Sequence, residues 1–388
     1  MTGIQQIGEF ETDPAVWGVN FPNQWDRWKR TTEDTAVTKY GGSKPIDKIA
    51  ENPRIKILYA GYPFSVEYNE ERGHGWSVVD VQKIKRLGDK KPGTCLSCKS
   101  SDTVKMWNEM GAEKFFNTPM KDLVAHADNP ISCLNCHDPK TMELTPRNPA
   151  FLAVMERRGV DLGKATRQQK RTYVCGQCHV EYYFEKKDNP ILHFPWDKGL
   201  NLDDIEKFYD EKGFYDWIHP DTGAKLIKIQ HPEFEFWSTG IHARSDVSCA
   251  DCHMPYQRIG SRKYSDHWVR SPMLNVAAAC QPCHRWPEQE LSERVLAIQD
   301  RTKSLLNRIE IALVDAIAAI KACRESGIPD EKLAEAQKLH RRAQIRWDFV
   351  FSENSMGFHS PQESARWLAE GIDYARQAES LAKQLIVR

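Results

Sequence analysis

The stretch that decides the fold is TCLSCKS, residues 94–100, because it is one residue away from a haem attachment site. In a c-type haem site, Cys-x-x-Cys forms two thioether bonds, and the histidine directly after the second cysteine binds the iron. Here the residue in that place is Lys99. Either the motif has lost its iron ligand, or a lysine serves in place of the histidine.

The same cysteine spacing recurs along the chain of 388 residues. Ten of the eleven cysteines form five Cys-x-x-Cys pairs, and four of these pairs are followed by histidine. The five motifs are CLSCK (Cys95, Cys98, Lys99), CLNCH (Cys133, Cys136, His137), CGQCH (Cys175, Cys178, His179), CADCH (Cys249, Cys252, His253) and CQPCH (Cys280, Cys283, His284). One such motif arises readily by chance, but five of them do not. We therefore predict five covalently bound c-type haems.

Zinc ribbons and disulfide frameworks are the other common uses of paired cysteines. A tetrahedral zinc site would take the pairs two at a time and does not need a histidine after each pair. Disulfide frameworks are typical of short chains that cannot build a hydrophobic core, which does not describe a chain of this length. The eleventh cysteine, Cys323, lies in a helical pattern and is expected to be a small buried apolar residue.

Composition gives no indication of a nucleic-acid partner or of a membrane as a partner. Lys and Arg together number 54, as do Asp and Glu, so net charge gives no reason to expect nucleic acid or an anionic membrane as a partner. No apolar run approaches the ~20 residues that a membrane helix needs. The first residues, MTGIQQIGEF, also lack the charged and then apolar pattern of a signal peptide. We expect no transmembrane segment, and an exported protein would have to be in a mature or trimmed form here.

The chain changes character near residue 285. Residues 1–285 are rich in proline, glycine and aromatic side chains, and they predict loops and short helices around the haems, whose faces would supply much of the apolar core. Residues 286–388 predict long helices. The fold class expected is mainly α, with a pentahaem catalytic and electron-transfer region followed by a helical region, together forming one compact unit.

Three helices are predicted in the last hundred residues. The first carries apolar residues at steps of three, four or seven and ends near Gly327 and Pro329. The second runs from about residue 329 to 353, and the third opens at Ser360 and Pro361. Their spare apolar faces suit internal packing or a homodimer interface. The apolar positions of the first helix are Leu291, Val295, Ile298, Leu305, Ile309, Leu313 and Ile317.

Histidines are numerous enough for a second ligand on each His-ligated iron. A haem that only transfers electrons is usually six-coordinate, whereas one that performs chemistry leaves a position open. Beyond the four motif histidines, nine remain. A lysine can bind iron only in its neutral form, which burial and coordination to a cation both favour.

Taken in order, these motifs resemble the pentahaem cytochrome c nitrite reductases, periplasmic enzymes that reduce nitrite to ammonium. The resemblance covers nearly the whole chain and rests on the CxxCK motif followed by four CxxCH motifs. It also rests on the stretches NPRIKILYAGYPFSVEYNEERGHG (52–75), CGQCHVEYYF (175–184) and KIQHPEFE (228–235). It implies a homodimer that receives electrons from a membrane-anchored quinol-oxidising cytochrome or a soluble multihaem cytochrome.

The resemblance also implies roles for single residues. Lys99 matches the ligand of the catalytic haem, and Arg86, Tyr182 and His231 match the residues beside it, with Arg72 as the alternative to Arg86. A calcium ion is implied, because oxygen ligands suit this hard cation. The ligands that the resemblance implies are Glu181, Tyr182, Lys228 and Gln230, with Tyr182 and Lys228 contributing backbone carbonyls and the other two contributing side chains. The distal haem ligands implied are His74, His242, His267 and His359, and their assignment to individual haems stays open. The ordinary histidines are then His126, His193, His219 and His340.

Two other functions remain open from the sequence. The chain could be a multihaem electron-transfer protein without a substrate site, in which every iron has two protein ligands. It could also be a related enzyme that converts hydroxylamine. Lys99 and the arrangement of the histidines argue against the electron-transfer protein, whereas a comparison of substrates has to decide between nitrite and hydroxylamine.

Overall fold

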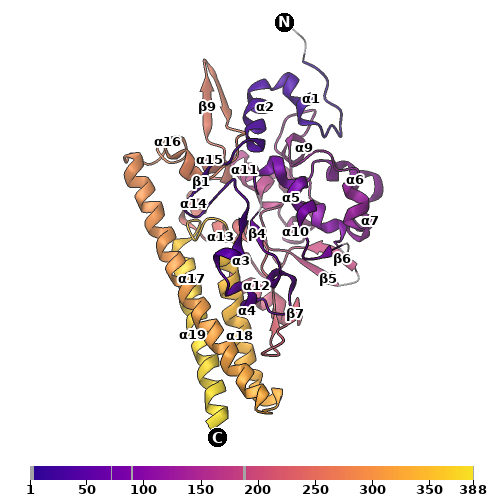
Figure 1. The fold of residues 1–388 in the computed structure, drawn as a ribbon. Helices are drawn as coiled ribbons and strands as arrows, with labels where there is room; N and C mark the ends of the chain where they lie inside the picture. The colour runs from indigo at the N-terminus through magenta and orange to yellow at the C-terminus, as the bar shows by residue number, and fades with distance from the viewer. Residues whose placement is uncertain (1–3, 71, 89–90, 187–188, 388) are drawn as a thin grey trace. The chain divides into compact units, whose positions relative to one another are not determined.

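The computed structural model describes residues 4–70, 72–88, 91–186 and 189–387. It divides into two compact units, each built from segments far apart in the sequence. The first unit comprises Met1–Ile46, Glu70–Asp197 and Ser245–Glu293, and the second comprises Asp47–Asn69, Lys198–Arg244 and Arg294–Arg388. Figure 1 colours the chain from its N-terminus to its C-terminus.

The first unit consists of short helices, loops and two-stranded ribbons, and it contains all five cysteine motifs. Its α-helices are α1 (Pro14–Asn20), α2 (Pro22–Lys29), α5 (Ser77–Lys83), α6 (Asp102–Met110), α7 (Ala112–Asn117), α8 (Met120–Val124), α9 (Cys133–Cys136), α10 (Pro149–Arg157), α11 (Arg167–Gly176), α15 (Cys249–His253) and α16 (Val276–Ala279). Its 3-10 helices are η1 (Arg30–Thr32), η3 (His74–Trp76), η5 (Gly93–Leu96), η6 (Leu162–Lys164) and η7 (Pro272–Leu274).

Strands occur only as antiparallel pairs among the described residues. In the first unit these are β1 (Val37–Thr38) with β2 (Gly41–Gly42), β5 (Tyr183–Lys186) with β6 (Asn189–His193), and β9 (Tyr256–Ile259) with β10 (Arg262–Ser265). The turn between β9 and β10 contains Gly260 at φ 58, a left-handed conformation that glycine adopts without a steric penalty. A further pair, β3 (Ile46–Asp47) with β4 (Asn69–Glu70), lies where the two units meet in the sequence.

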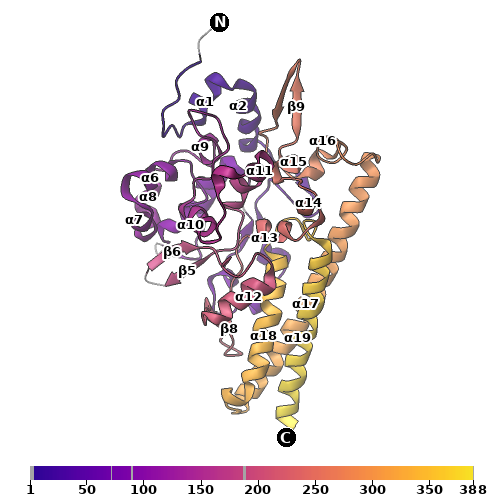
Figure 2. The ribbon, with the colours of Figure 1, turned by 180° about the vertical axis from the view of Figure 1, so that it is seen from behind.

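The second unit is dominated by three long helices, α17 (Glu288–Glu325), α18 (Asp330–Phe351) and α19 (Pro361–Val387). Figures 1 and 2 show them side by side from opposite directions. These bounds confirm the predicted helical region and the mainly α fold. The unit's other elements are α3 (Lys48–Glu51), α4 (Ile55–Leu58), η2 (Pro63–Ser65), α12 (Leu202–Glu211), β7 (Trp217–Ile218), β8 (Lys225–Leu226), α13 (Glu233–Ser238) and α14 (Ile241–Arg244).

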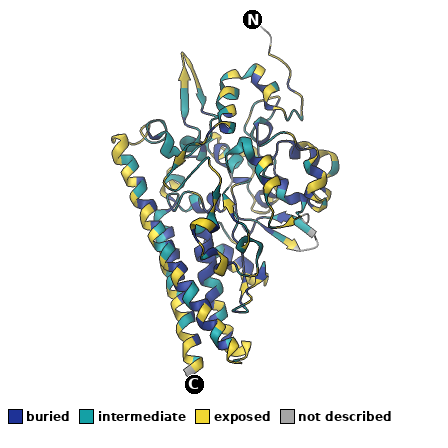
Figure 3. Cartoon of the chain, viewed as in Figure 1, coloured by how far each residue is buried: buried dark blue, intermediate teal, exposed yellow. Residues whose placement is uncertain are grey.

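The helices pack through small residues. Alanines of α17, α18 and α19 form a buried cluster together with Ile320, Leu333 and Leu339, and small side chains let helix backbones approach closely. Cys323 is fully buried in this cluster, as predicted from the sequence. Figure 3 shows exposed positions along the outer sides of the same helices. No helix in the described part of the chain has both the length and the apolar character required to cross a bilayer.

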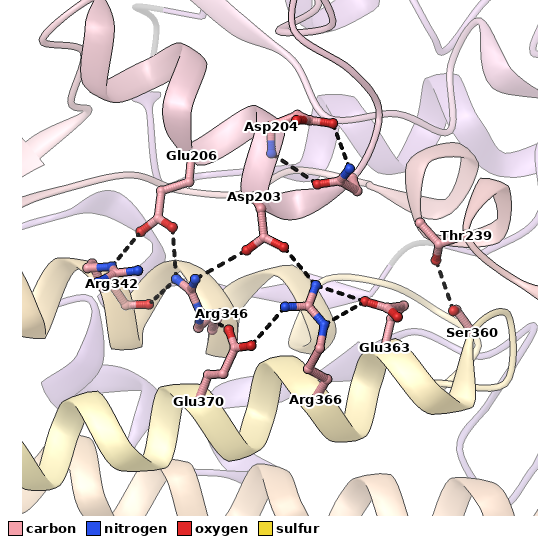
Figure 4. A network of polar contacts seen from close by, with 11 residues as sticks. Asp203, Asp204, Glu206, Thr239, Arg342, Arg346, Ser360, Glu363, Arg366 and Glu370 are labelled. Atoms are coloured by element: carbon pink, nitrogen blue, oxygen red, sulfur yellow. Dashed lines mark hydrogen bonds and ion pairs between the residues drawn. The ribbon is translucent and has the colours of Figure 1, made fainter.

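A network of charged side chains joins α12 to α18 and α19, as Figure 4 shows. Arg346 is 1% exposed, and its guanidinium contacts three carboxylates, from Asp203, Glu206 and Glu370. A guanidinium presents several donors in a fixed plane, so one buried arginine can satisfy several carboxylates. Arg366 shares two of these partners, Asp203 and Glu370. The network fixes the start of α12 against the helical bundle.

Candidate haem-binding and active site

Two of the motifs with histidine owe their local shape to capping. Ser132 begins α9 and Ser248 begins α15, and in each helix the side chain three residues later bonds back to the backbone N–H of that serine. These partners are Asn135 and Asp251, which lie between the two cysteines of their motifs. Such a capping box satisfies backbone groups at a helix start. The variable residues inside the motifs therefore hold the cysteines in one helical turn.

The motifs also contact one another. Gln177, between the cysteines of CGQCH, donates from Nε2 to the carbonyl oxygen of Asn135 in CLNCH, at 2.9 Å. Asn148 donates to the carbonyl of Gln177 at 3.0 Å and lies 3.7 Å from the sulfur of Cys98. Three motifs therefore meet at Gln177 and Asn148, both of which are buried.

A buried arginine connects the third motif to the fourth. Arg171 of α11 is 3% exposed, and it binds the carboxylate of Asp251 at 2.9 Å. The sulfur atoms of Cys175 and Cys249 are hydrogen-bond partners, and this bond, burial and the charge of Cys175 raise the pKa of Cys249 well above its usual value. The fifth motif continues the series, because Cys280 acts on the pKa of Cys252.

The arrangement does not fit the two alternative uses of paired cysteines. All eleven cysteines lie in the described residues, and no two of them form a disulfide there. No group of three or more His, Cys, Asp or Glu side chains in the described ranges converges in a way that would hold a metal ion directly. Tetrahedral zinc sites require such convergence. The motif cysteines are instead placed as separate pairs.

Two pairs of histidines are spaced for an iron between them. The ring centroids of His74 and His179 are 6.3 Å apart, and those of His137 and His267 are 6.2 Å apart. Imidazole nitrogens that bind one metal from opposite sides, each at about 2 Å, are separated by about 4 Å, and the ring centroids lie beyond them. Both separations match this geometry. The chain's side chains therefore fit a haem between each pair.

Hydrogen bonds orient these rings. Nδ1 of His137 lies 2.9 Å from the carbonyl oxygen of Met142. Nδ1 of His253 lies 3.1 Å from the carbonyl oxygen of Arg270, and Nδ1 of His267 lies 2.8 Å from that of Ser265. A ring that donates from Nδ1 leaves the lone pair of Nε2 for a metal. Burial lowers the pKa of His74 and of His267 to about 4. The charge of Lys99 adds to this effect for His74, and that of His137 adds to it for His267. Both histidines are therefore neutral, as ligation requires.

The other expected distal ligands, His242 and His359, belong to the second unit. Nδ1 of His359 lies 2.5 Å from a carboxylate oxygen of Glu353, which again leaves Nε2 for a metal. The ring of His242 lies 5.9 Å from that of Phe358. Gly240 has to be glycine, because a Cβ there would lie 2.0 Å from the carbonyl oxygen of His359.

Lys99 lies in the turn that follows η5 in the first unit. Its carbonyl oxygen is 2.6 Å from the hydroxyl of Ser77, which is also 2.8 Å from the carbonyl oxygen of His74. Gly93 begins η5, and only glycine fits there, because a Cβ would lie 2.2 Å from the carbonyl oxygen of Phe115. The ammonium of Lys99 is close enough to affect the pKa of His74 and of Cys95. The residues expected around the first motif are therefore neighbours.

Arg86 and Tyr182 adjoin the same motif. Tyr182 has a pKa well above its usual value, because burial and the charges of Cys95 and Cys98 outweigh the opposing charge of Arg86. Arg86 acts in the same way on Cys95. Arg72, the alternative to Arg86, is instead paired with Asp80 and stacks on the ring of Trp76 at 3.7 Å. This arrangement favours Arg86 as the arginine beside the first motif.

The residues expected to hold calcium are divided between the two units. Glu181 is fully buried and precedes Tyr182 in the first unit. Lys228, which is 1% exposed, and Gln230 lie in the second unit, where the side-chain amide of Gln230 donates to the carbonyl oxygen of Lys228 at 3.2 Å. His231 follows directly and leads into α13. Segment 228–231 thus presents oxygen donors and a histidine together.

The ordinary histidines have various surroundings. His126 is exposed, and His193 lies 3.5 Å from Glu185. His219 and His340 are fully buried with ring centroids 5.4 Å apart. His340 is bonded to Thr222 at 3.2 Å.

Several residues that shape the site gave no sequence signal of their own. Ser77 and Glu353 contact expected ligands, and Asp348 contacts Lys228 at 2.9 Å. A charged residue inside the apolar helical stretch IRWDFVF was the one available sign that Asp348 has a buried partner. Its partner, however, lies in a different part of the sequence.

Known proteins with similar sequences and structures bear on these observations. The cytochrome c-552 of Porphyromonas gingivalis is 38% identical over 99% of this chain and 78% of its own length. That of Bacteroides fragilis is 39% identical over all of this chain and 79% of its own length. Among solved structures, the cytochrome c nitrite reductase of Desulfovibrio desulfuricans, whose catalytic subunit is described with two calcium sites, superposes with a TM-score of 0.91 at 34% identity. That match covers 98% of this chain and 88% of the other.

The match to a family is equally extensive. Residues 13–388 correspond to the family described as cytochrome c552, so the match includes all five motifs and the helical region. Together with the paired histidines and the separate cysteine pairs, it identifies the chain as a multihaem cytochrome c of the cytochrome c552 family.

Proposed function

We propose that this chain is a cytochrome c nitrite reductase that reduces nitrite to ammonium at the haem attached to Cys95 and Cys98. The observation that carries the proposal is Lys99 in the place of the motif histidine, with Arg86 and Tyr182 beside the same cysteines. Similarity to the Desulfovibrio desulfuricans enzyme over 98% of the chain supports nitrite as the substrate.

The side chains near Lys99 suit an anionic substrate that must gain protons. Arg86 contributes a permanent positive charge for nitrite, and fixed donors stabilise an oxygen that gains charge as its bond to nitrogen breaks. A tyrosine has an ordinary pKa of about 10, and burial raises the pKa of Tyr182 further, so at neutral pH it keeps its hydroxyl proton and can donate a hydrogen bond. His231 is proposed as a further donor. When bound, the haem supplies the open iron position and the path for six electrons.

Four further haems are proposed to relay electrons, each with two histidine ligands. The spacing of the rings supports His74 with His179 in one of them and His137 with His267 in another. His253 and His284 then take His242 and His359 as partners, and the order of this last assignment stays open. Ligation of every relay iron on both sides keeps substrate at the lysine-ligated iron.

A calcium ion is proposed next to the catalytic residues, held by Glu181, Tyr182, Lys228 and Gln230. The solved enzyme from Desulfovibrio desulfuricans is described with calcium sites, and the donors here are oxygens. Glu181 and Lys228 are buried, and the side-chain amide of Gln230 lies beside the carbonyl of Lys228. The ion would hold Tyr182 in place.

The remaining parts of the proposal concern the setting of the enzyme. We propose a periplasmic location, because c-type haem proteins of this kind work outside the cytoplasm. Electrons would come from a quinol-oxidising membrane cytochrome or a soluble multihaem cytochrome. Homodimerisation through residues 286–388 is proposed from the length of α17 and α19.

Ammonium formation by the holoprotein tests the function. Reduced viologen supplies electrons, and nitrite, hydroxylamine and sulfite are compared as substrates. We expect nitrite to be converted to ammonium with the highest kcat/KM. A higher kcat/KM for hydroxylamine would favour the hydroxylamine-converting enzyme. An electron paramagnetic resonance spectrum with only low-spin haem and no change on adding nitrite would favour a pure electron carrier.

A further inference from the structure

The side chain of Lys228 is buried in the second unit, although a calcium ion would need only its carbonyl oxygen. It is 1% exposed, and its ammonium forms an ion pair with Oδ1 of Asp348 at 2.9 Å. Burying an ammonium is costly unless it is paired and hydrogen-bonded. The ammonium also donates to the hydroxyl of Ser352, at 2.8 Å. The long side chain therefore acts as an anchor that points into the helical bundle.

Asp348 holds the backbone of the same segment as well as the lysine. Its second oxygen, Oδ2, accepts the backbone N–H of Ile229 at 2.8 Å. Asp348 is fully buried on α18, and it also accepts hydrogen bonds from the hydroxyls of Ser352 and Tyr59. One carboxylate thus fixes two adjacent residues of segment 228–231 to a rigid helix.

A second carboxylate fixes the start of this segment. Oδ2 of Asp216 accepts the backbone N–H of Lys228 at 2.7 Å. Two successive backbone N–H groups are then held by two carboxylates, and the lysine side chain is held by one of them. With both N–H groups and the side chain fixed, the carbonyl of Lys228 has one available direction, in which it lies 3.2 Å from the amide of Gln230.

We infer that Asp348 is a positioning residue for the calcium ligands. Through the ammonium of Lys228 and the N–H of Ile229, it directs the Lys228 carbonyl and the Gln230 side chain toward the ion, and it sets the backbone that carries His231. This inference rests on the proposed function, since the ion and the role of His231 are parts of that proposal. Asp348 itself contacts neither the ion nor the substrate.

Calcium affinity of the holoprotein tests the inference. Asp348→Asn keeps the shape of the side chain and removes its charge. After chelation of bound metal, titration calorimetry with Ca²⁺ should show binding about ten- to a hundred-fold weaker than in the unsubstituted protein, as is typical when a residue supporting a metal ligand is lost. Ammonium formation by this variant should recover as Ca²⁺ is raised, because the defect lies in occupancy.

Glu206→Gln is the matched control. Glu206 of α12 is also buried, and it pairs at 3.0 Å with Arg346, which lies on α18 as Asp348 does. This ion pair does not involve segment 228–231. We expect a comparable loss of thermal stability with an unchanged Ca²⁺ affinity. Equal affinities in Asp348→Asn, Glu206→Gln and the unsubstituted protein would overturn the inference.

Two milder variants serve if Asp348→Asn does not accumulate with its haems. Tyr59→Phe and Ser352→Ala each remove one hydroxyl from Asp348, and each should weaken Ca²⁺ binding by a smaller factor. Unchanged affinity in both would overturn the inference. An unsubstituted protein that binds Ca²⁺ but forms no ammonium would overturn the proposed reaction and leave this inference standing. One that forms ammonium but binds no Ca²⁺ would overturn this inference together with the proposed calcium site, and leave the proposed reaction standing.

Discussion

Nδ1 of His359 lies 2.5 Å from Oε1 of Glu353, a carboxylate that is 2% exposed. In His137, His253 and His267 the same nitrogen faces a neutral backbone carbonyl. Burial opposes ionisation of Glu353, but the charge of His359 and its hydrogen bond outweigh this and lower the pKa of the carboxyl. A charged acceptor makes an imidazole a stronger donor to a metal. As a proposed haem ligand, His359 should therefore favour the oxidised state of the iron.

Glu353→Gln is expected to raise the midpoint potential of one haem. A loss of about 1.4 kcal/mol of interaction corresponds to about 59 mV for a one-electron couple, so the shift should be on the order of 60 mV. Spectroelectrochemical titration of the holoprotein measures it. Glu363→Gln, at a partly exposed carboxylate paired with Arg366, is the control. Identical potentials in the two variants would contradict the role of Glu353.

Lys99→Ala should abolish nitrite turnover while all five haems remain attached, because both cysteines of the motif are intact. The mass of the variant checks haem attachment, and the viologen assay checks turnover. Full activity in this variant would show that Lys99 is not the working iron ligand.

Arg86→Gln is expected to lower kcat/KM for nitrite by about a hundred-fold or more, as is typical when a fixed donor to a developing charge is removed. Arg72→Gln is the comparison, because its guanidinium is paired with Asp80. That variant should lose stability and keep its kcat/KM. The reverse result would transfer the catalytic role from Arg86 to Arg72.

His340→Gln should reduce the loss of stability in acid. Burial lowers the pKa of both His340 and His219 in the folded protein. The unfolded chain then binds more protons, so this stability is fully present above about pH 6.5 and is lost as pH falls, at about 1.4 kcal/mol per pH unit for each histidine. Thermal midpoints between pH 5 and 8 measure the slope. His126→Gln, at an exposed position, should leave the slope unchanged.

Arg346→Met should destabilise the fold by about 3 kcal/mol, because it leaves the buried carboxylate of Glu206 without its closest cation. Arg376→Met is the control. Arg376 pairs with Asp315 and Glu379 on the surface, and exposed pairs contribute at most about 1 kcal/mol. Urea denaturation compares the two variants, and similar midpoints would show that the network in Figure 4 adds little.

Some features could be predicted from the sequence because they are local. The cysteine motifs have fixed covalent spacing, and α17 to α19 repeat apolar residues with a helical period. Pairing of His74 with His179 and of His137 with His267 joins segments far apart in the chain, and spacing alone carries no information about it. Resemblance to a family supplied the candidate ligands, and the ring distances then supported a partner for two of them, His74 and His267.

Buried polar anchors were beyond prediction for the same reason. Asp348 is one of several charged residues in α18, and nothing in the sequence of that helix identifies Lys228 or Tyr59 as its partners. The residues between the cysteines gave no signal either, although Asn135 and Gln177 turn out to connect two motifs.

The contacts of Gln177, Asn148 and Arg171 give the CGQCH motif three neighbours, CLSCK, CLNCH and CADCH. A branched series of electron carriers responds differently from a linear one to the loss of a single member. If the proposed haems follow these contacts, the haem on CGQCH would have three haems as neighbours, and the haem on CLNCH would form a side branch of the relay. In the proposed relay, loss of the haem on CGQCH would interrupt electron transfer from the haem on CADCH to the haem on CLSCK, whereas loss of the haem on CLNCH would leave that route intact.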